Sequence, residues 1–194
     1  MRLYLEQKTN LFTDDLRLLH FAPESVLQKL FRAMPNLDYI GVDIDSPLAQ
    51  IRLDITKIPF RDGAVDVILC SHVLEHVMDD RAAMGELFRV LKPGGWAILQ
   101  VPMELSRAQT YEDSRIVSPE ERQRAFGRYN HVRIYGRDYK DRLRQAGFAV
   151  KVDDFAQRLG PKLIRRYGLQ GEENIYFSTK PAVLDERPFY GRPS

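Results

Sequence analysis

The sequence of 194 residues lacks a long apolar run and contains a single cysteine, Cys70. Its apolar stretches, such as "AVDVILC" at 64–70, are far shorter than the roughly 20 residues that a membrane-spanning helix needs. The amino terminus has no uninterrupted hydrophobic segment that would indicate a targeting signal. A single cysteine cannot form an internal disulfide, which agrees with a reducing compartment. These absences predict a cytoplasmic protein with no membrane span.

Neither sign of charge predominates, because the sequence has 29 lysine and arginine residues and 27 aspartate and glutamate residues, which gives a formal net charge of +2. Nucleic-acid-binding domains usually carry a clear basic excess, so a nucleic-acid partner is not expected. The length and the 44% content of hydrophobic residues suit one well-buried core. We therefore expect a single domain with a small-molecule partner, and the composition leaves the oligomeric state open.

Glycine is missing from "RLLHFAPESVLQKL" at 17–30, where a strand at 16–21 is predicted to run into an amphipathic helix with Pro23 at its first position. Nucleotide-binding α/β proteins usually have a glycine-rich turn at this junction, because glycine adopts positive φ and lets the backbone approach the ligand. Two explanations are open. Either other residues rebuild the turn, or the turn no longer binds a cofactor.

Strand and helix patterns alternate from residue 16 to residue 102. Further strands are predicted at 37–44, 51–55, 64–71 and 96–102, and a helix capped near Asp79 or Asp80 is stopped by "KPGG" at 92–95. The segment 64–71 is apolar enough to be a central strand that is buried on both faces. This order predicts an α/β fold with an open, doubly wound and mostly parallel sheet.

The alternation is interrupted at 103–135 by a polar, arginine-rich segment, which we interpret as an insertion or lid over the sheet edge. Within it, "SPEE" predicts a helix start with Ser118 as the cap, Pro119 in the first turn and Glu121 closing a capping box. A helix within 136–148 and strands at 149–154 and 174–180 would complete one domain spanning 1–180. The tail at 181–194 has three prolines and is expected to be extended.

Polar side chains follow each predicted parallel strand. Asp43 and Asp45 come after the second strand, Asp54 after the third, and the segment 71–76 after the fourth. The carboxyl ends of parallel strands form one rim, where ligands bind in such folds. An acid after the second strand can hold a ribose diol, and one after the third can accept a hydrogen bond from an adenine amino group. The alternative for any one aspartate is a turn or cap residue.

Four segments together resemble the class I S-adenosylmethionine-dependent methyltransferases of the small-molecule type. They are "GVDID" at 41–45, "DITKIPF" at 54–60, "DGAVDVILCSHVLEHV" at 62–77 and "ELFRVLKPGGWAILQVP" at 86–102. The resemblance implies a sheet of about seven strands with an antiparallel carboxyl-terminal strand, and S-adenosylmethionine lying across the ends of the first four strands. The cofactor contacts that we predict on this basis are His20, Ala22, Glu24, Asp43, Ile44, Asp54, Ile55, Ser71 and His72.

The sequence departs from this family at "HFAPE", residues 20–24. Ala22 is the smallest substitute for glycine, and Pro23 gives up an amide that a first helical turn leaves unpaired in any case. The helix amino terminus still offers other free amides to the methionine carboxylate, and Glu24 or His20 is placed to meet the methionine ammonium group. The sequence therefore predicts a rebuilt turn.

The segment "HVLEH" at 72–76 also matches the inverted zinc-protease pattern, in which two histidines and a glutamate lie together on a helix. The pattern here follows directly on a buried strand instead of lying within a long helix. We therefore predict no metal. Capping and loop hydrogen bonds are the alternative roles of His72 and His76.

Methyl transfer from a sulfonium is a direct displacement, so the enzyme must align the reactants and remove a proton from a hydroxyl or amine acceptor. Histidine suits that proton transfer at neutral pH, and the candidates are His76 and His131, with a structural role as the alternative for His131. The main hypothesis is a methyltransferase acting on a small molecule. A non-catalytic scaffold that retains the fold is the second hypothesis, and a dinucleotide oxidoreductase, which lacks its Gly-x-Gly-x-x-Gly signature here, is the third.

Overall fold

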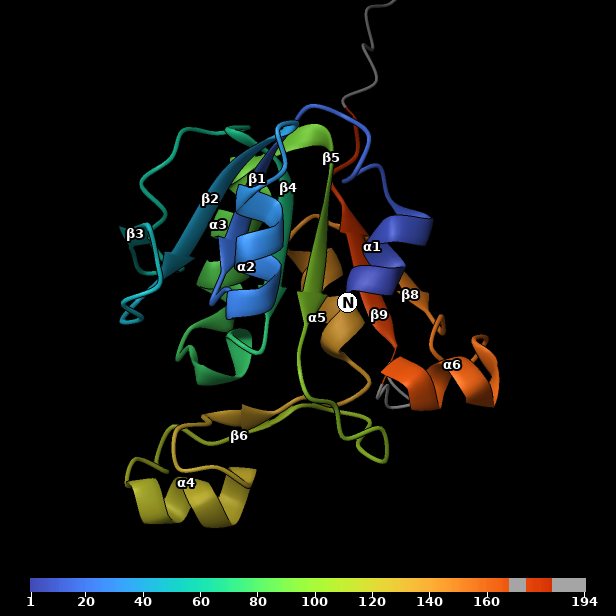
Figure 1. The fold of residues 1–194 in the computed structure, drawn as a ribbon. Coiled ribbons are helices and arrows are strands. Elements are labelled where there is room, and N and C mark those ends of the chain that lie inside the picture. Colours follow the sequence, from blue (N-terminus) through green and yellow to red (C-terminus); the bar gives the residue numbers. More distant parts are fainter. Residues whose placement is uncertain (168–173, 183–194) are drawn as a thin grey trace, which may run out of the picture.

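The computed structural model describes residues 1–167 and 174–182, and Figure 1 shows its fold. One seven-stranded sheet has the order β3-β2-β1-β4-β5-β9-β8. Strands β3, β2, β1, β4 and β5 pair in parallel, whereas β9 is antiparallel to both β5 and β8. The prediction of a mostly parallel sheet with an antiparallel carboxyl-terminal strand is confirmed. The strands are β1 (Leu16–Phe21), β2 (Leu37–Asp43), β3 (Ile51–Arg52), β4 (Val65–Ser71), β5 (Leu91–Gln100), β8 (Ala149–Asp153) and β9 (Ile175–Thr179).

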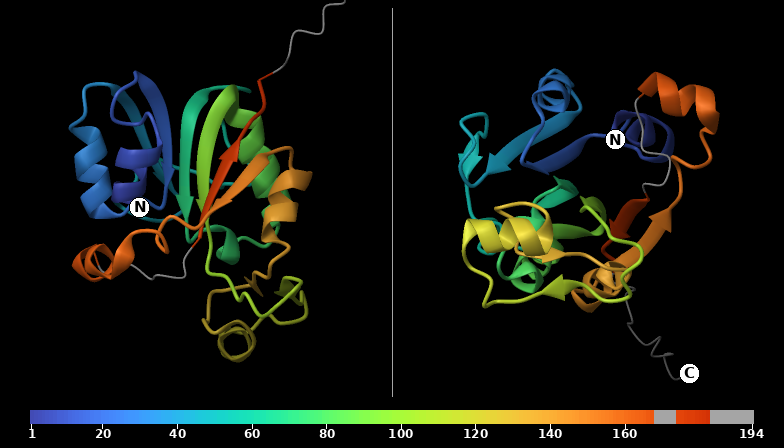
Figure 2. Two further views of the ribbon diagram at one scale, coloured as in Figure 1. Left: turned by 90° about the vertical axis from the view of Figure 1, so that its right-hand side faces the viewer. Right: turned by 90° about the horizontal axis from the view of Figure 1, so that it is seen from below.

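Helices cover both faces of this sheet. Helices α1 and α2 lie on one face and α3 and α5 on the other, as the two turned views in Figure 2 show. No helix among the described residues has both the length and the apolar composition that crossing a bilayer requires. The helices are α1 (Arg2–Lys8), α2 (Ser25–Arg32), the short 3-10 helix η1 (Leu74–His76), α3 (Asp80–Val90), α4 (Pro119–Phe126), α5 (Tyr139–Gln145) and α6 (Gly160–Tyr167).

The continuous apolar runs of the central strands arise because successive side chains enter two different cores. Leu18 packs in the core under α1 and α2, and the next residue, Leu19, packs in the core under α3 and α5. The same alternation separates Val67 from Ile68 in β4. Cys70 lies in the second of these cores and is fully buried. Burial raises the pKa of its thiol, which makes it an unreactive core residue.

Several element boundaries differ from the sequence prediction, among them those of β5, which begins at Leu91, includes the segment at 92–95 and ends at Gln100, where a strand at 96–102 was expected. Helix α2 begins at Ser25, so Pro23 lies in the preceding turn and Glu24 is the residue before the first helical turn. Strand β3 ends at Arg52 instead of continuing to residue 55. The chain turns there because Oδ1 of Asp54 accepts hydrogen bonds from the backbone N and from Oγ1 of Thr56, both at 2.8 Å.

The segment between β5 and α5 lies beyond the carboxyl ends of the central strands (Figure 1). It contains α4 and two short antiparallel strands, β6 (Tyr111–Glu112) and β7 (Arg133–Ile134). The predicted capping box is confirmed, because Ser118 and Glu121 exchange backbone and side-chain hydrogen bonds. The division into a domain at 1–180, an insertion and a tail stays a prediction. Residues 183–194 of that tail lie outside the described residues.

A buried ionic network joins this segment to the core. The Asp80 carboxylate at the start of α3 accepts hydrogen bonds from Tyr135 Oη at 2.8 Å and from Arg142 Nη1 at 3.1 Å. Arg142 and Arg133 also both bind Glu112 of β6. Arg133 in turn donates to the carbonyl oxygens of Leu74 and Met78, at 2.8 and 2.9 Å. The network therefore fixes the segment at 74–78 as well as the two short strands.

We predict that Tyr135→Phe lowers the free energy of unfolding by about 2 kcal/mol, since a hydrogen bond to a charged group contributes about 1.5–3 kcal/mol and Asp80 stays buried when it is lost. Urea unfolding followed by circular dichroism measures the change. Tyr129→Phe is the matched control, because the side chain of Tyr129 is exposed, and its unfolding curve should coincide with that of the wild type. Equal stability of the two variants would contradict the role assigned to the network.

Candidate active site

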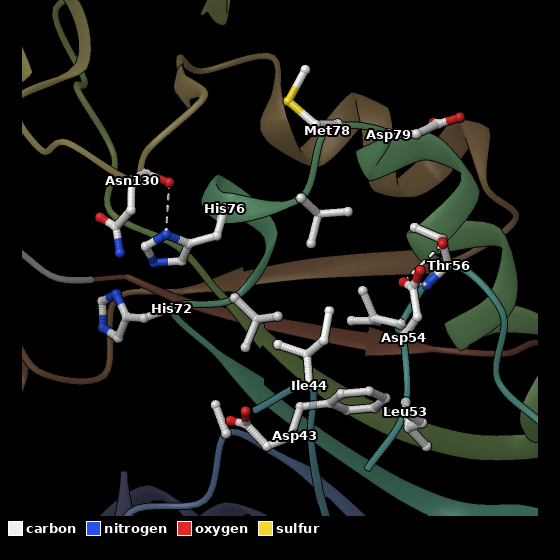
Figure 3. A pocket seen from close by; sticks show the side chains of 15 residues that line it. Asp43, Ile44, Leu53, Asp54, Thr56, His72, His76, Met78, Asp79 and Asn130 are labelled. Atoms are coloured by element: carbon white, nitrogen blue, oxygen red, sulfur yellow. Dashed lines mark hydrogen bonds between the residues drawn. The ribbon is translucent and has the colours of Figure 1, made fainter. Parts of the chain in front are cut away.

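A pocket of about 670 Å³ opens at the carboxyl ends of β1, β2 and β4, and Figure 3 shows its side chains. This volume is within the range of about 300–1,000 Å³ that is typical of small-molecule sites. The walls are largely apolar, with carboxylates on one side and imidazole rings on another. The lining residues are Phe21, Ala22, Asp43, Ile44, Leu53, Asp54, Ile55, Thr56, His72, Val73, His76, Val77, Met78, Asp79 and Asn130.

The structure brings seven of the predicted site residues together in this pocket. They are Ala22, Asp43, Ile44, Asp54, Ile55, His72 and His76. Four others, His20, Glu24, Ser71 and His131, do not line it. The sequence analysis did not identify Phe21, Leu53 and Val73, which form the apolar walls of the pocket. The signal that could have identified them is their position in apolar runs at the ends of strands.

At the glycine-free turn, an alanine adopts the positive φ that glycine usually provides, and the prediction that this turn still binds a cofactor stays a prediction. Ala22 follows β1 with φ at 45°, and His72 follows β4 with φ at 56°. Their backbone N–H groups donate to the carbonyl oxygens of Val42 and Gln100, each at 2.9 Å, so each turn is tied to the neighbouring strand. A non-glycine residue in this region costs roughly 1–2 kcal/mol. Both strained residues line the pocket, where such strain is commonly found.

Two carboxylates are held in fixed orientations along the pocket (Figure 3). Oδ1 of Asp43 accepts hydrogen bonds from the backbone N–H groups of Asp45 and Ser46, at 2.7 and 2.8 Å. The backbone N–H of Thr56, with its hydroxyl, lowers the pKa of the Asp54 carboxyl. Ile44 stands between them with 63% of its surface exposed, which leaves an apolar face available to a flat ligand.

The two polar residues of the glycine-free turn are engaged with each other. His20 is buried, with Nδ1 3.3 Å from Tyr39 Oη and Nε2 3.6 Å from a carboxylate oxygen of Glu24. This contact lowers the pKa of the Glu24 carboxyl. The predicted contacts of His20 and Glu24 with a cofactor stay predictions.

The two candidate catalytic histidines are in contact. The His76 and His131 rings pack edge to face with centroids 4.8 Å apart, and Nδ1 of His76 lies 3.1 Å from the carbonyl oxygen of Asn130. His131 faces a neighbouring cavity of about 240 Å³ under α4. Burial, reinforced by His76, lowers the pKa of His131. The histidines thus lie on the wall between two hollows.

A family model of methyltransferase domains matches residues 23–99 of this chain. An uncharacterized methyltransferase of Mycobacterium sp. (strain KMS) is 41% identical over 75 residues, which are 33% of this chain and 30% of that protein. Demethylmenaquinone methyltransferase of Streptomyces avermitilis is 44% identical over 46 residues, which are 24% of this chain and 20% of that protein. Residues 23–99 are therefore similar to methyltransferase domains, and a probable S-adenosylmethionine-dependent methyltransferase of Mycolicibacterium smegmatis is among the relatives, with 31% identity over 78 residues. It spans about a third of the length of the curated relatives that it matches first.

Solved structures share the fold at low identity. The 1,6-didemethyltoxoflavin-N1-methyltransferase of Burkholderia thailandensis, with bound S-adenosylhomocysteine, aligns with a TM-score of 0.58 and 13% identity over 87% of this chain and 72% of that one. The [4+2]-cyclase SpnF aligns with a TM-score of 0.62 and 18% identity, over 93% of this chain and 80% of that one. These likenesses support the Rossmann-like methyltransferase fold.

The pocket fits the cofactor of this family, S-adenosylmethionine. Asp43 presents an oriented carboxylate at the end of β2, Asp54 presents another beyond β3, and Ile44 supplies an apolar surface between them. Ala22 adds no more than a methyl group at the end of β1, so the backbone can approach a ligand closely. The roles predicted for Asp43 toward a ribose diol and for Asp54 toward an adenine edge agree with this arrangement and stay predictions.

We predict that Ala22→Gly leaves the free energy of unfolding unchanged or raises it by up to about 1 kcal/mol, because relief of the left-handed strain is partly offset by a more flexible unfolded chain. Ala22→Val should lower it by more than about 1 kcal/mol, since a branched side chain fits positive φ poorly. Thermal unfolding monitored by calorimetry measures both changes.

Ala33→Gly is the control for this pair of variants. Ala33 follows α2 with φ at −86°, where glycine brings no relief and should cost about 0.5–1 kcal/mol. If Ala22→Gly destabilised the protein as much as Ala33→Gly does, the left-handed turn would not be the strained element that we describe.

Proposed function

We propose that this chain transfers a methyl group from S-adenosylmethionine to a small-molecule acceptor. The observation that carries the proposal is the Asp43 carboxylate, which two backbone amides hold in the pocket at the end of β2. An anchored carboxylate is already ordered before a ligand arrives, so less entropy is lost when it binds a diol. When bound, the cofactor supplies a methyl group on a positively charged sulfur.

The polar residues on the far wall of the pocket are proposed to meet the acceptor. His76 and Asn130 line the pocket, and His131 lies behind His76 on the side of the insertion. Here His76 and His131 contact the acceptor and help to remove its proton.

The segment at 103–135 is proposed to cover the acceptor side of the site, within a single domain that extends to residue 180. The ionic network of Arg133, Glu112 and Asp80 ties its strands to the core, which suits a fixed cover better than a swinging lid. A cytoplasmic location belongs to the same proposal and is supported by Cys70, which is buried as a free thiol.

A non-catalytic or differently catalytic use of the fold is the second candidate. It is favoured by the glycine-free turn and by the likeness to a structure described as a [4+2]-cyclase. A methyl-transfer assay with radiolabelled S-adenosylmethionine and a panel of metabolites separates the two candidates, provided that cofactor binding is measured independently.

We predict that Asp43→Asn weakens binding of S-adenosylhomocysteine by about 10- to 100-fold, the equivalent of losing a charge-assisted hydrogen bond of about 1.5–3 kcal/mol. The asparagine oxygen can still accept from the N–H groups of Asp45 and Ser46, so the turn is retained and the charge is removed. Isothermal titration calorimetry measures the affinity.

Asp45→Asn is the matched control, because Asp45 lies two residues away, forms an exposed ion pair with Arg52 and does not line the pocket. Its affinity for S-adenosylhomocysteine should equal that of the wild type. The proposal fails if the wild type binds neither S-adenosylmethionine nor S-adenosylhomocysteine, or if Asp43→Asn binds as tightly as Asp45→Asn does.

A further inference from the structure

The carboxylate of Glu75 in η1 is buried without a full set of partners. Its side chain is 2% exposed, and Oε2 has no hydrogen-bond partner within the described part of the chain. Oε1 lies 3.5 Å from Nδ1 of His72 and 4.0 Å from Nε2 of His76, and neither ring is charged unless it is protonated. A buried carboxylate without a cation is costly, because it has lost its hydration.

The orientation of the His76 ring adds to this imbalance. Nδ1 lies 3.1 Å from the Asn130 carbonyl oxygen, and a carbonyl accepts but cannot donate, so the ring proton is on Nδ1. In the neutral ring, Nε2 then carries a lone pair and lies 4.0 Å from Oε1 of Glu75. A histidine whose Nδ1–H donates to a backbone carbonyl, with Nε2 left free, has the arrangement that metal ligands usually show.

His131, from the segment between β5 and α5, is the third residue that lies close to Glu75 and His76. One ligand atom from each of Glu75, His76 and His131 lies within 4.8 Å of the other two. Arg133 holds this turn from the insertion side through the carbonyl oxygens of Leu74 and Met78. Two imidazoles and one carboxylate form a ligand set that binds divalent first-row metals while leaving coordination positions open.

We propose that Glu75, His76 and His131 form a binding site for a divalent first-row transition metal. The metal supplies the positive charge that the Glu75 carboxylate lacks and occupies the space that the His76 lone pair faces. Neighbouring ligand atoms on one such ion lie about 3.3 Å apart, so binding draws the three side chains inward.

This site differs from the one that the sequence pattern indicates. The pattern at 72–76 pairs His72 with His76, whereas the structure replaces His72 by His131, which lies 55 positions after His76. His72 stands on the pocket side with 58% of its side chain exposed. The sequence prediction of no metal rested on that linear pattern, in which His131 does not take part.

The position of the group indicates what its open coordination sites would bind. His76 lines the cofactor pocket and His131 lines the cavity under α4, so the ion would lie at the boundary between the two hollows. An acceptor with a hydroxyl or carboxylate oxygen could bind the ion there. This role in acceptor binding rests on the proposed methyl transfer, whereas the metal site itself does not. With the ion bound, the ion takes over from the two histidines the task of acidifying the acceptor, because the imidazole lone pairs are then engaged in coordination.

The test is a titration of the chelator-treated full chain with Co²⁺, read by visible absorption, followed by competition with Zn²⁺. We expect one Co²⁺ per chain with d–d bands typical of nitrogen and oxygen ligands. Glu75→Gln and His131→Gln should each weaken binding by at least about 100-fold, since loss even of a residue that supports a ligand costs about 10- to 100-fold.

Asp45→Asn is the control here as well, because it exchanges a carboxylate for an amide as Glu75→Gln does, and Asp45 is exposed, forms an ion pair with Arg52 and lies outside the proposed ligand set. Its Co²⁺ affinity should stay within about threefold of the wild type, well short of the loss expected for a ligand. The proposal is overturned if the wild type binds neither ion, if Glu75→Gln and His131→Gln bind as tightly as the wild type, or if Asp45→Asn loses binding as they do.

Binding of S-adenosylhomocysteine to the same metal-free samples separates this proposal from the methyltransferase proposal. If Glu75→Gln still binds S-adenosylhomocysteine with the affinity of the wild type, the variant is folded. Its loss of Co²⁺ binding is then due to the loss of the Glu75 carboxylate as a metal ligand. Failure of the wild type to bind S-adenosylhomocysteine would remove the proposed function and leave the metal titration to stand on its own result.

Discussion

The buried carboxylate of Asp80 is the charge on which the arrangement of the site depends. It lies at the first position of α3, and it is matched by Tyr135 and Arg142 from segments that follow in the chain by more than fifty residues. A carboxylate removed from water is tolerated only in a well-formed set of partners. The network therefore permits one placement of β7 against α3, and through Arg133 one placement of the turn at 74–78.

The turn at 74–78 is important because its residues lie between two cavities. On one side, His76 and Val77 line the cofactor pocket, and on the other, His76 packs against His131 beside the cavity under α4. The peptide at its start is fixed as well, since the left-handed His72 is hydrogen-bonded to β5. A rigid turn between two cavities keeps groups that act on different ligands at constant separation, which is what a transfer reaction needs.

Sequence reasoning succeeded where the signal was local or periodic. The caps at Asp79 and Ser118 and the alternation of strands and helices each follow from a few adjacent residues. Seven of the residues predicted from the resemblance and from the strand ends line one pocket, because parallel strands bring their carboxyl ends to one rim, and their contacts with a ligand stay predictions. The positive φ of Ala22 became visible only in the structure.

Interactions between distant segments could not be predicted, because no periodic pattern relates the residues that form them. Nothing in the sequence pairs Asp80 with Arg142, or Glu75 with His131, and the pattern at 72–76 pointed to a neighbour in the chain instead of a neighbour in space. The motifs that carry the resemblance end at residue 102, and the segment that follows supplies His131, Arg133 and Tyr135. Residues beyond those motifs therefore hold a turn that the motifs begin, and their contacts with it became visible only in the structure.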